Sequence, residues 1–168
     1  MRLLGLDPGL RITGWGVLEQ RDNRLIWVAD GTVTSDEKLT LAERLAQLSR
    51  GVSGVIERFR PDEGAIEETF VNKNPASTLK LGQARGAVLT AAGLAGIPVS
   101  EYAPSLVKKS VVGGGQAAKQ QIGMMIRQLL PACEIATEDA ADALAVAICH
   151  AHHRGHAAMM LKLAGARR

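Results

Sequence analysis

The sequence predicts an α/β fold in which helices flank a five-stranded mixed sheet. The first third of the chain contains three strand-like runs with short links, which favour antiparallel neighbours. After them, helical and strand-like segments alternate, as is typical of parallel strands joined by crossover helices. A length of 168 residues usually corresponds to one domain with one core, and we expect residues 1–155 to form it.

The first three strands are expected at residues 2–7, 13–20 and 25–34. The first is a mostly apolar run that ends at Asp7, and the turn Pro8-Gly9 follows it. The other two are separated by Arg21-Asp22-Asn23, which has the composition of a tight turn. These links are too short for crossover connections, so an antiparallel meander is expected.

A crossover helix is expected next, because Thr40 and Glu43 form a capping-box pattern. Apolar residues follow at helical spacing: Leu41, Leu45, Leu48, Val52, Val55, Ile56 and Phe59. Pro61 stops this helix, and a strand that ends at Glu67 follows. A strand reached through a crossover helix is expected beside the first and parallel to it, so that Asp7 and Glu67 emerge at one edge of the sheet.

The remainder of the chain is mostly helical. Asn74-Pro75 begins a helix with asparagine as the cap, and Pro98 opens a short fifth strand to Tyr102. Further helices are expected at residues 103–112, 116–130 and 137 to about 153, with Gly113-Gly114-Gly115 as a hinge between the first two. Residues 156–168 form a small, basic tail that we expect to fray.

Composition and charge exclude several classes of protein. The net charge of +3 and a pI of about 9.1 are compatible with nucleic acid but do not identify it. Cys133 and Cys149 are too few for a disulfide framework and are expected to be reduced thiols in a cytoplasmic protein. We expect no signal peptide, because a strand-like run begins at once, and no apolar run approaches membrane-spanning length. His150 and His153 share a helix face, but two ligands do not close a zinc site.

Four carboxylates are candidates for a metal site: Asp7, Glu67, Asp139 and Asp142. Glu67 precedes Glu68, and strand alternation lets only one of these two face the site. Asp139 near the start of its helix also suits the helix dipole, whereas Asp142 in the second turn is less easily explained that way. Carboxylates brought together repel one another unless hard cations lie between them. The set therefore indicates phosphoryl chemistry on a nucleic acid.

Five motifs occur in order between residues 3 and 150: Gly5-Leu6-Asp7-Pro8-Gly9, Thr13-Gly14-Trp15-Gly16, Ala65-Ile66-Glu67, Leu81-Gly82-Gln83-Ala84-Arg85-Gly86 and Asp139-Ala140-Ala141-Asp142-Ala143-Leu144-Ala145. Together they resemble the RuvC family of bacterial Holliday-junction resolvases, which has an RNase H-like fold. The resemblance implies an endodeoxyribonuclease that resolves four-way junctions in recombination and repair by paired symmetric nicks with 5′-phosphate ends. It also implies that the four acids bind two Mg²⁺ ions, which Mn²⁺ can replace. Some relatives have His in place of Asp139.

The same resemblance implies contacts with DNA and with protein partners. Lys108 and Lys119 match basic DNA-contacting positions of the family, and Phe70 matches an aromatic that inserts against unstacked bases, although a core Phe is the simpler interpretation. Further candidates for DNA contact are Lys109, Lys73, Lys80 and Arg85. The helix with Gly82 and Gly86 matches the family's homodimer interface, although its small residues also suit packing on its own sheet. A RuvA–RuvB branch-migration complex is the further partner that the resemblance implies.

Two other functions fit parts of the pattern. A non-catalytic nucleic-acid-binding module on the same fold would be expected to lose acidic residues, and this chain keeps all four. An actin-like ATPase half also begins with a strand, an Asp and a Gly-rich hairpin, but it needs a second domain to close over ATP. The chain is too short to contain that domain.

Overall fold

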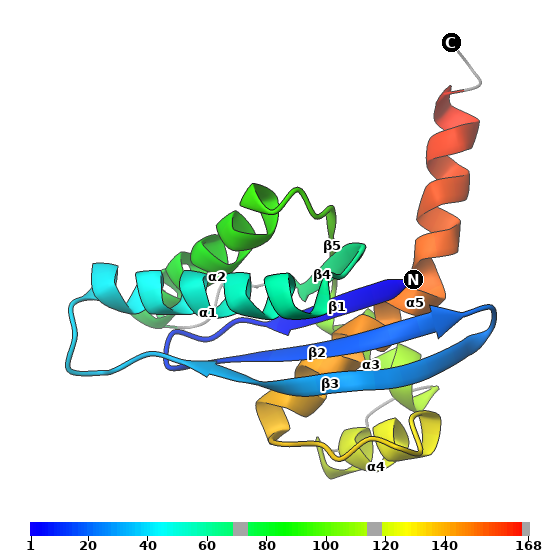
Figure 1. The fold of residues 1–168 in the computed structure, drawn as a ribbon, viewed down its shortest axis with the longest axis horizontal. Coiled ribbons are helices and arrows are strands. Elements are labelled where there is room, and N and C mark those ends of the chain that lie inside the picture. The colour runs from blue at the N-terminus through cyan, green and yellow to red at the C-terminus, as the bar shows by residue number, and fades with distance from the viewer. Residues whose placement is uncertain (69–73, 114–118, 166–168) are drawn as a thin grey trace.

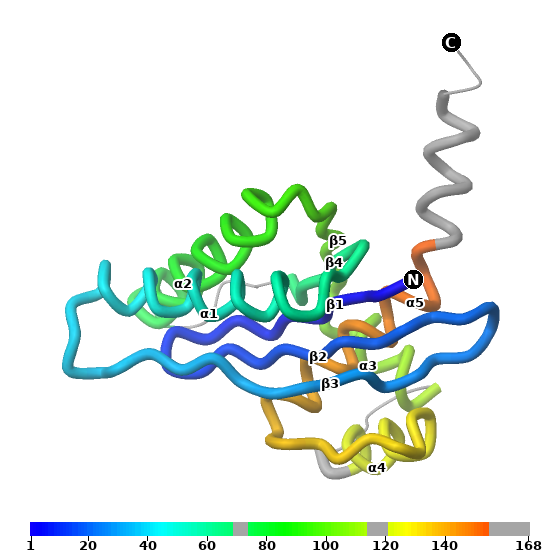
Figure 2. The backbone as a smooth tube through the Cα atoms, in the orientation of Figure 1, coloured from blue at the N-terminus to red at the C-terminus, as the bar shows by residue number. Residues whose placement is uncertain are grey.

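The structure, a computed structural model, describes residues 1–68, 74–113 and 119–165, and for residues 119, 120 and 155–165 it describes the backbone alone. A five-stranded sheet in the order β3-β2-β1-β4-β5 forms the middle of three layers (Figure 1). Helices α1 (Leu41–Phe59) and α2 (Pro75–Leu94) cover one face. Helices α3 (Pro104–Val112), α4 (Lys119–Leu129) and α5 (Glu138–Gly165) cover the other, as the backbone trace in Figure 2 also shows. The predicted α/β architecture is confirmed.

The strand pairing follows the predicted connections. The strands are β1 (Arg2–Asp7), β2 (Ile12–Arg21), β3 (Arg24–Thr34), β4 (Glu63–Glu67) and β5 (Val99–Tyr102). The first three form the expected antiparallel meander. Strand β4, which returns through α1, pairs with β1 in parallel, with Leu6 opposite Ile66. Strand β5 extends the sheet in parallel beyond β4. The carboxyl ends of β1 and β4 therefore lie side by side.

Local signals in the sequence explain where the first two helices begin and end. Thr40 and Glu43 form the complete capping box at the start of α1, and Arg60 ends that helix in a left-handed conformation. The Asn74 side chain accepts from the backbone N–H groups of Ala76 and Ser77 at the start of α2. Both helix starts are therefore as predicted.

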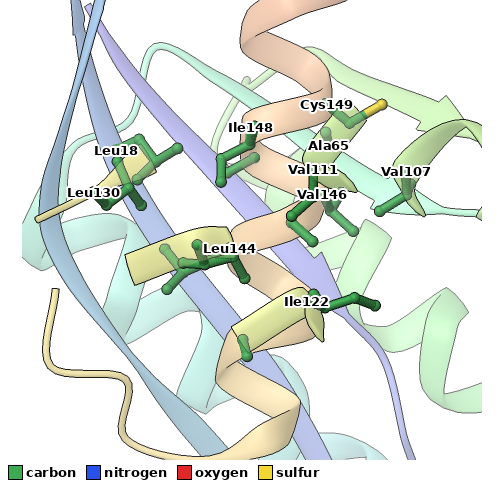
Figure 3. Close-up of a cluster of buried hydrophobic side chains, with 14 of the residues drawn as sticks. Leu18, Ala65, Val107, Val111, Ile122, Leu130, Leu144, Val146, Ile148 and Cys149 are labelled. Carbon is green, nitrogen blue, oxygen red and sulfur yellow. The ribbon is translucent and has the colours of Figure 1, made fainter. Parts of the chain in front are cut away.

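The hydrophobic core is divided by the sheet into two clusters. On one face, Leu4, Leu6 and Ile66 pack against α1 and α2. On the other face, Ala65 and residues of α3, α4 and α5 form a second cluster, which includes Leu144 and Ile148 (Figure 3). Successive residues of β4, such as Ala65 and Ile66, thus face opposite layers. Both free cysteines are buried.

Helix α5 lies unusually close to the sheet because glycines face it. A Cβ atom at Gly5 would lie 2.0 Å from the Ala143 carbonyl oxygen, and one at Gly14 would lie 2.0 Å from the Asp139 carbonyl oxygen. Real side chains do not tolerate such distances, so both positions require glycine. The backbone of α5 thus rests directly on β1 and β2, which fixes the depth of its acidic residues.

The last helix extends further than the sequence suggested. We expected it to end at about His153 and a frayed tail to follow, but α5 continues to Gly165. The segment after Gly155 is rich in Ala, Met and Leu, which have high helix propensity and outweigh the cost of Gly155. Gly113 ends α3 at a positive φ of 74°, as a hinge residue can, while Gly114 and Gly115 lie outside the described residues. Within the described part, no helix has the length and apolar character to cross a membrane.

Candidate active site

Three of the four predicted acids meet in one pocket. Asp7 ends β1, Glu67 ends the neighbouring β4, and Asp142 comes from α5. They line a cavity of about 350 Å³ together with Lys108 of α3. The rest of the wall is mostly apolar and consists of Pro104, Val107, Val111, Ile122 and Ala145. Low-polarity walls strengthen the electrostatic interactions of the charged groups that face the cavity.

The turn after β1 holds Asp7 in position. The buried Thr13 hydroxyl donates to the Gly9 carbonyl at 3.0 Å and accepts from the Gly9 N–H at 3.4 Å. A Cβ atom at Gly9 would lie 2.3 Å from the Ile12 carbonyl oxygen, so the turn can be this tight only with glycine. The Asp-Pro-Gly sequence therefore places a carboxylate at a fixed strand end.

Strand alternation explains why Glu67 faces the cavity. Ala65 packs under α5 and Ile66 packs on the opposite face, so Glu67 returns to the side of α5. Glu68 lies beyond the end of the strand, where its N–H donates to the Tyr102 carbonyl at 2.8 Å. The choice of Glu67 over Glu68 agrees with the geometry.

The electrostatics of the pocket favour a cation. Burial raises the pKa of the Glu67 carboxyl group, the negative charge of Asp142 raises it further, and Lys108 acts in the opposite direction. A carboxylate with a raised pKa is stabilised by a proton or by another cation. The donor atoms offered by Asp7, Glu67 and Asp142 are all carboxylate oxygens, the type that hard divalent cations prefer.

Asp139 lies near this pocket but does not line it. Its backbone carbonyl touches Gly14, the residue paired with Asp7 across β1 and β2. The Thr137 hydroxyl accepts from the Ala140 N–H at 3.1 Å at the start of α5, so Asp139 also occupies the helix turn that suits an acidic residue. Within the described residues, no three His, Cys, Asp or Glu side chains are grouped closely enough to hold a metal ion on their own. The donor set suits a hard cation in its chemistry, and DNA phosphate oxygens can complete its coordination.

A second cavity of about 310 Å³ adjoins the first, with Asp142 and Ile122 common to both. It lies between α4 and the start of α5, and Arg127 lines it. Sequence reasoning missed Arg127. Its signal is the four-residue spacing from Gly123, which places both residues on one face of α4, and the Arg127 Nη1 lies 3.9 Å from a Cβ atom built at Gly123.

The predicted DNA contacts fall in three places. Lys108 lines the acidic pocket, whereas Lys109 is exposed on α3 outside it. Phe70 and Lys73 lie outside the described residues, and so does the side chain of Lys119, the first residue of α4. Lys80 is exposed on α2. Arg85, by contrast, is only 13% exposed, and its guanidinium bonds to the Glu67 carbonyl and to Glu101, so it is not available to DNA.

One face of α2 is uncovered. Gly82 and Gly86 are exposed, and nothing lies within 4 Å of a Cβ atom built at either position. Leu79 and Leu94 on the same helix are 64% and 85% exposed. Packing on the protein's own sheet instead uses Ala84, Val88, Ala91 and Ala92. The alternative of packing on the protein's own sheet thus holds for the small residues Ala84, Ala91 and Ala92 but not for Gly82 and Gly86.

The histidines of α5 have structural partners. The buried His150 contacts the Tyr102 hydroxyl at 2.9 Å through Nδ1 and Glu63 at 3.0 Å through Nε2. His153 lies 2.9 Å from the Cys149 carbonyl. Both histidines that share a face thus have hydrogen-bond partners within the protein.

Comparison with known proteins gives consistent matches over nearly the whole chain. The family model for "Crossover junction endodeoxyribonuclease RuvC" matches residues 3–150. The crossover junction endodeoxyribonuclease RuvC of Rhodospirillum rubrum is 66% identical over 99% of this chain and 98% of its own. That of Paramagnetospirillum magneticum is 66% identical over 92% of this chain and 93% of its own.

Solved structures agree with these matches. T. thermophilus RuvC in complex with a Holliday junction substrate is similar with a TM-score of 0.83 and 36% identity, covering 90% of this chain and 93% of that one. The yeast mitochondrial Holliday junction resolvase, at 15% identity and a TM-score of 0.60, shares the fold. It covers 94% of this chain and 85% of its own. The RNase H-like fold expected from the motifs is confirmed.

Proposed function

The chain belongs to the RuvC family of crossover junction endodeoxyribonucleases, and from this premise we propose how its residues resolve four-way DNA junctions. The protein is a hydrolase that acts on Holliday junctions in recombination and repair. The observation that supports the site most directly is the convergence of Asp7, Glu67 and Asp142 on one pocket, at the adjoining ends of β1 and β4.

In this proposal, Asp7, Glu67 and Asp142 hold divalent cations, and Asp139 joins them once DNA is bound. Mg²⁺ is the expected ion, with Mn²⁺ as a substitute, and two ions held by these carboxylates would supply Lewis-acid chemistry at the scissile phosphate. The raised pKa of Glu67 supports this role, because burial and then the charge of Asp142 disfavour its ionised form, which a bound cation would stabilise. The turn at Gly9 and the close seating of α5 keep the carboxylates in fixed positions.

The lysines near the pocket would bind the DNA backbone. We expect Lys108 to contact a DNA phosphate near the scissile one, because it lines the same cavity as the acids. Lys119 is the first residue of α4, and the positive charge of a lysine and the amino end of a helix would both attract phosphate. Lys109 and Lys73 would add weaker contacts, and Phe70 would stack on unpaired bases at the crossover.

The uncovered face of α2 supports a homodimer as the working state. Gly82 and Gly86 allow a second copy of the helix to approach closely, and Leu79 and Leu94 supply apolar area to bury. A two-fold dimer would present two pockets to a junction that is itself two-fold symmetric, which would allow paired nicks on opposed strands. Each nick is expected to leave a 5′-phosphate end. A RuvA–RuvB complex would deliver the junction in the bacterial cytoplasm, a setting that suits the two free cysteines.

A dimer of this kind can be tested at Gly86. Replacing Gly86 by Arg places a bulky charge on the exposed face, so dimerisation and paired nicking are expected to weaken together. Sedimentation measures the first and product analysis on a cruciform plasmid the second. A wild-type protein that sediments as a monomer and still makes coordinated paired nicks would contradict the proposal.

The catalytic assignment can be tested with Asp142→Asn. This change removes a metal ligand and a negative charge while keeping the shape, so it should abolish Mg²⁺-dependent cleavage of a four-way junction. Junction binding should be retained or become tighter, because a charge that repels phosphate is lost. Parallel loss of cleavage and binding would point to misfolding, and cleavage at the wild-type rate would overturn the assignment. ATP turnover measured on the same protein tests the actin-like alternative.

A further inference from the structure

Arg85 connects helix α2 to the end of the strand that carries Glu67. Its guanidinium Nη1 donates to the backbone carbonyl of Glu67, and Nη2 pairs with the Glu101 carboxylate on β5. The Arg85 side chain is 13% exposed, whereas that of Glu101 is 52% exposed. The Arg85 side chain, which is mostly buried, therefore joins helix α2 to the neighbouring strands β4 and β5.

At Glu67, strand β4 keeps a partner strand on one side only. Pairing between β1 and β4 ends one residue before Glu67, whereas Glu67 still pairs with Tyr102 of β5 and the Glu68 N–H donates to the Tyr102 carbonyl at 2.8 Å. Arg85 supplies the hydrogen-bond donor for the carbonyl of the half-buried Glu67. A guanidinium is planar and its N–H groups have a fixed geometry, so two simultaneous acceptors define its orientation closely. Arg85 on the carbonyl and Tyr102 on the N–H together constrain the peptide plane after Glu67, and with it the direction of the Glu67 side chain.

We infer that Arg85 is a positioning residue for Glu67, which holds this carboxylate at the angle that metal binding in the pocket requires. The inference rests on the proposed function, in which Glu67 is a metal ligand. Arg85 does not touch the cavity itself, whose wall includes Glu67, Asp7 and Asp142. It acts through the backbone of Glu67, as groups that orient metal ligands commonly do.

The position of Arg85 on α2 has a further consequence. Gly82 and Gly86 lie three residues before it and one residue after it on the same helix. Ala84 and Val88 pack α2 onto the sheet, so a shift of this helix would move the Arg85 guanidinium and the Glu67 carbonyl together.

Arg154 provides a matched control at the other end of the same strand. It forms two hydrogen bonds with Glu63, at 2.8 and 2.9 Å, and its side chain is 28% exposed. Glu63 begins β4 and Glu67 ends it. Arg154→Met thus removes an arginine–glutamate pair from the same strand without changing the support of Glu67.

The experiment compares Arg85→Met, Arg85→Lys, Glu101→Gln and Arg154→Met. Single-turnover cleavage of a four-way junction is measured against Mg²⁺ concentration, junction affinity is measured in EDTA, and Mg²⁺ binding to the DNA-free protein is followed by calorimetry.

Arg85→Met is expected to weaken Mg²⁺ binding and slow cleavage about 10–100-fold, with unchanged junction affinity. Arg85→Lys keeps one donor and should recover part of the loss, and Glu101→Gln should cause a smaller loss. Arg154→Met should lower the melting temperature and leave Mg²⁺ dependence unchanged.

Three results would overturn the inference. The first is wild-type Mg²⁺ dependence in Arg85→Met, and the second is a loss of junction affinity in Arg85→Met as large as its loss of cleavage. The third is an equal change in the Mg²⁺ dependence of Arg154→Met when the two variants are equally stable. If Arg85→Met does not fold, the Mg²⁺ dependence of Arg85→Lys and Glu101→Gln decides the question. Glu67→Gln separates this inference from the proposed function. An active Glu67→Gln protein overturns the function assigned to Glu67, whereas an inactive one beside a normal Arg85→Met overturns the inference alone.

Discussion

Strand β4 begins and ends with a glutamate, and the two side chains lie on the same face of the sheet in opposite electrostatic environments. Glu63 accepts two hydrogen bonds from Arg154, and these hold the pKa of its carboxyl group below the usual value. Glu67 lies in a pocket with Asp142, and burial, followed by that negative charge, raises its pKa. Arg154 pairs directly with Glu63, whereas Lys108 acts on Glu67 through its charge alone and does not offset the effects of burial and of Asp142. The difference distinguishes a carboxylate that stabilises the fold from one that is suited to bind metal.

His150 belongs to the stabilising end of this comparison. Burial lowers its pKa, although the neighbouring Glu63 carboxylate acts in the opposite direction. A neutral imidazole suits both of its contacts, because Nε2–H then donates to Glu63 while Nδ1 accepts from the Tyr102 hydroxyl. The contact with Glu63 is therefore a hydrogen bond to a carboxylate, and the tautomer follows from this network.

The largest expected effect is a difference in cleavage rate between substitutions at Glu67 and at Glu63. Glu67→Gln should reduce junction cleavage by more than about 100-fold, because an electrostatic group in the reacting pocket is lost. Glu63→Gln, the same substitution on the same strand, should cleave at close to the wild-type rate. Single-turnover rates on a labelled four-way junction measure both. Similar losses in the two variants would break the comparison.

A smaller effect is expected in the stability gained from metal. Mg²⁺ at 100 times its dissociation constant should raise the free energy of unfolding of the wild-type protein by about 2.7 kcal/mol. Glu63→Gln should keep this increment, whereas Glu67→Gln should lose most of it. Chemical denaturation with Mg²⁺ and with EDTA measures the increment for each protein. An unchanged increment in Glu67→Gln would show that the ion binds elsewhere.

The smallest effect is a pH dependence of opposite sign at the two positions, measured without metal. Because the folded-state pKa of Glu63 is lowered, its contribution to stability is present above the ordinary value of 4.5 and is lost as pH falls through the folded-state pKa. Because that of Glu67 is raised, its contribution is present below 4.5 and is lost as pH rises through the folded-state pKa.

The two glutamine variants should therefore differ from the wild type in opposite directions. At neutral pH, Glu63→Gln should be less stable by about 1 kcal/mol and Glu67→Gln should be more stable. Both differences should shrink in acid, below pH 4.5. Urea unfolding at a series of pH values tests this, and differences of the same sign would refute the assignment of the two environments.

Much of the site could be predicted because it depends on short-range rules. A crossover helix between β1 and β4 is enough to make them parallel neighbours, and this brings Asp7 and Glu67 to one edge. Strand alternation lets only one of Glu67 and Glu68 face that edge, and the resemblance of Ala65-Ile66-Glu67 to the family motif selected Glu67. Asp142 was assigned from the same resemblance, and it lines the pocket with the other two acids.

The residues that support the site could not be predicted in this way. Arg85 was a candidate for DNA contact because an arginine on a helix is usually solvated, and its acceptors come from β4 and β5. The partners of Glu63 come from α5, far away in the sequence. Such pairs depend on how closely one layer of the fold packs against the next. The periodicity and composition of the sequence do not determine that distance.

The glycines beneath α5 would also mislead a random mutagenesis screen for inactive variants. Any other residue at Gly5 or Gly14 must push α5 away from the sheet, since a Cβ there meets the helix backbone at 2.0 Å. Asp142 would move with the helix, and activity would fall although no ligand had changed. In such a screen these two positions would be recovered as often as the acids themselves. A hit there reports the distance between two layers of the protein rather than a role in the reaction.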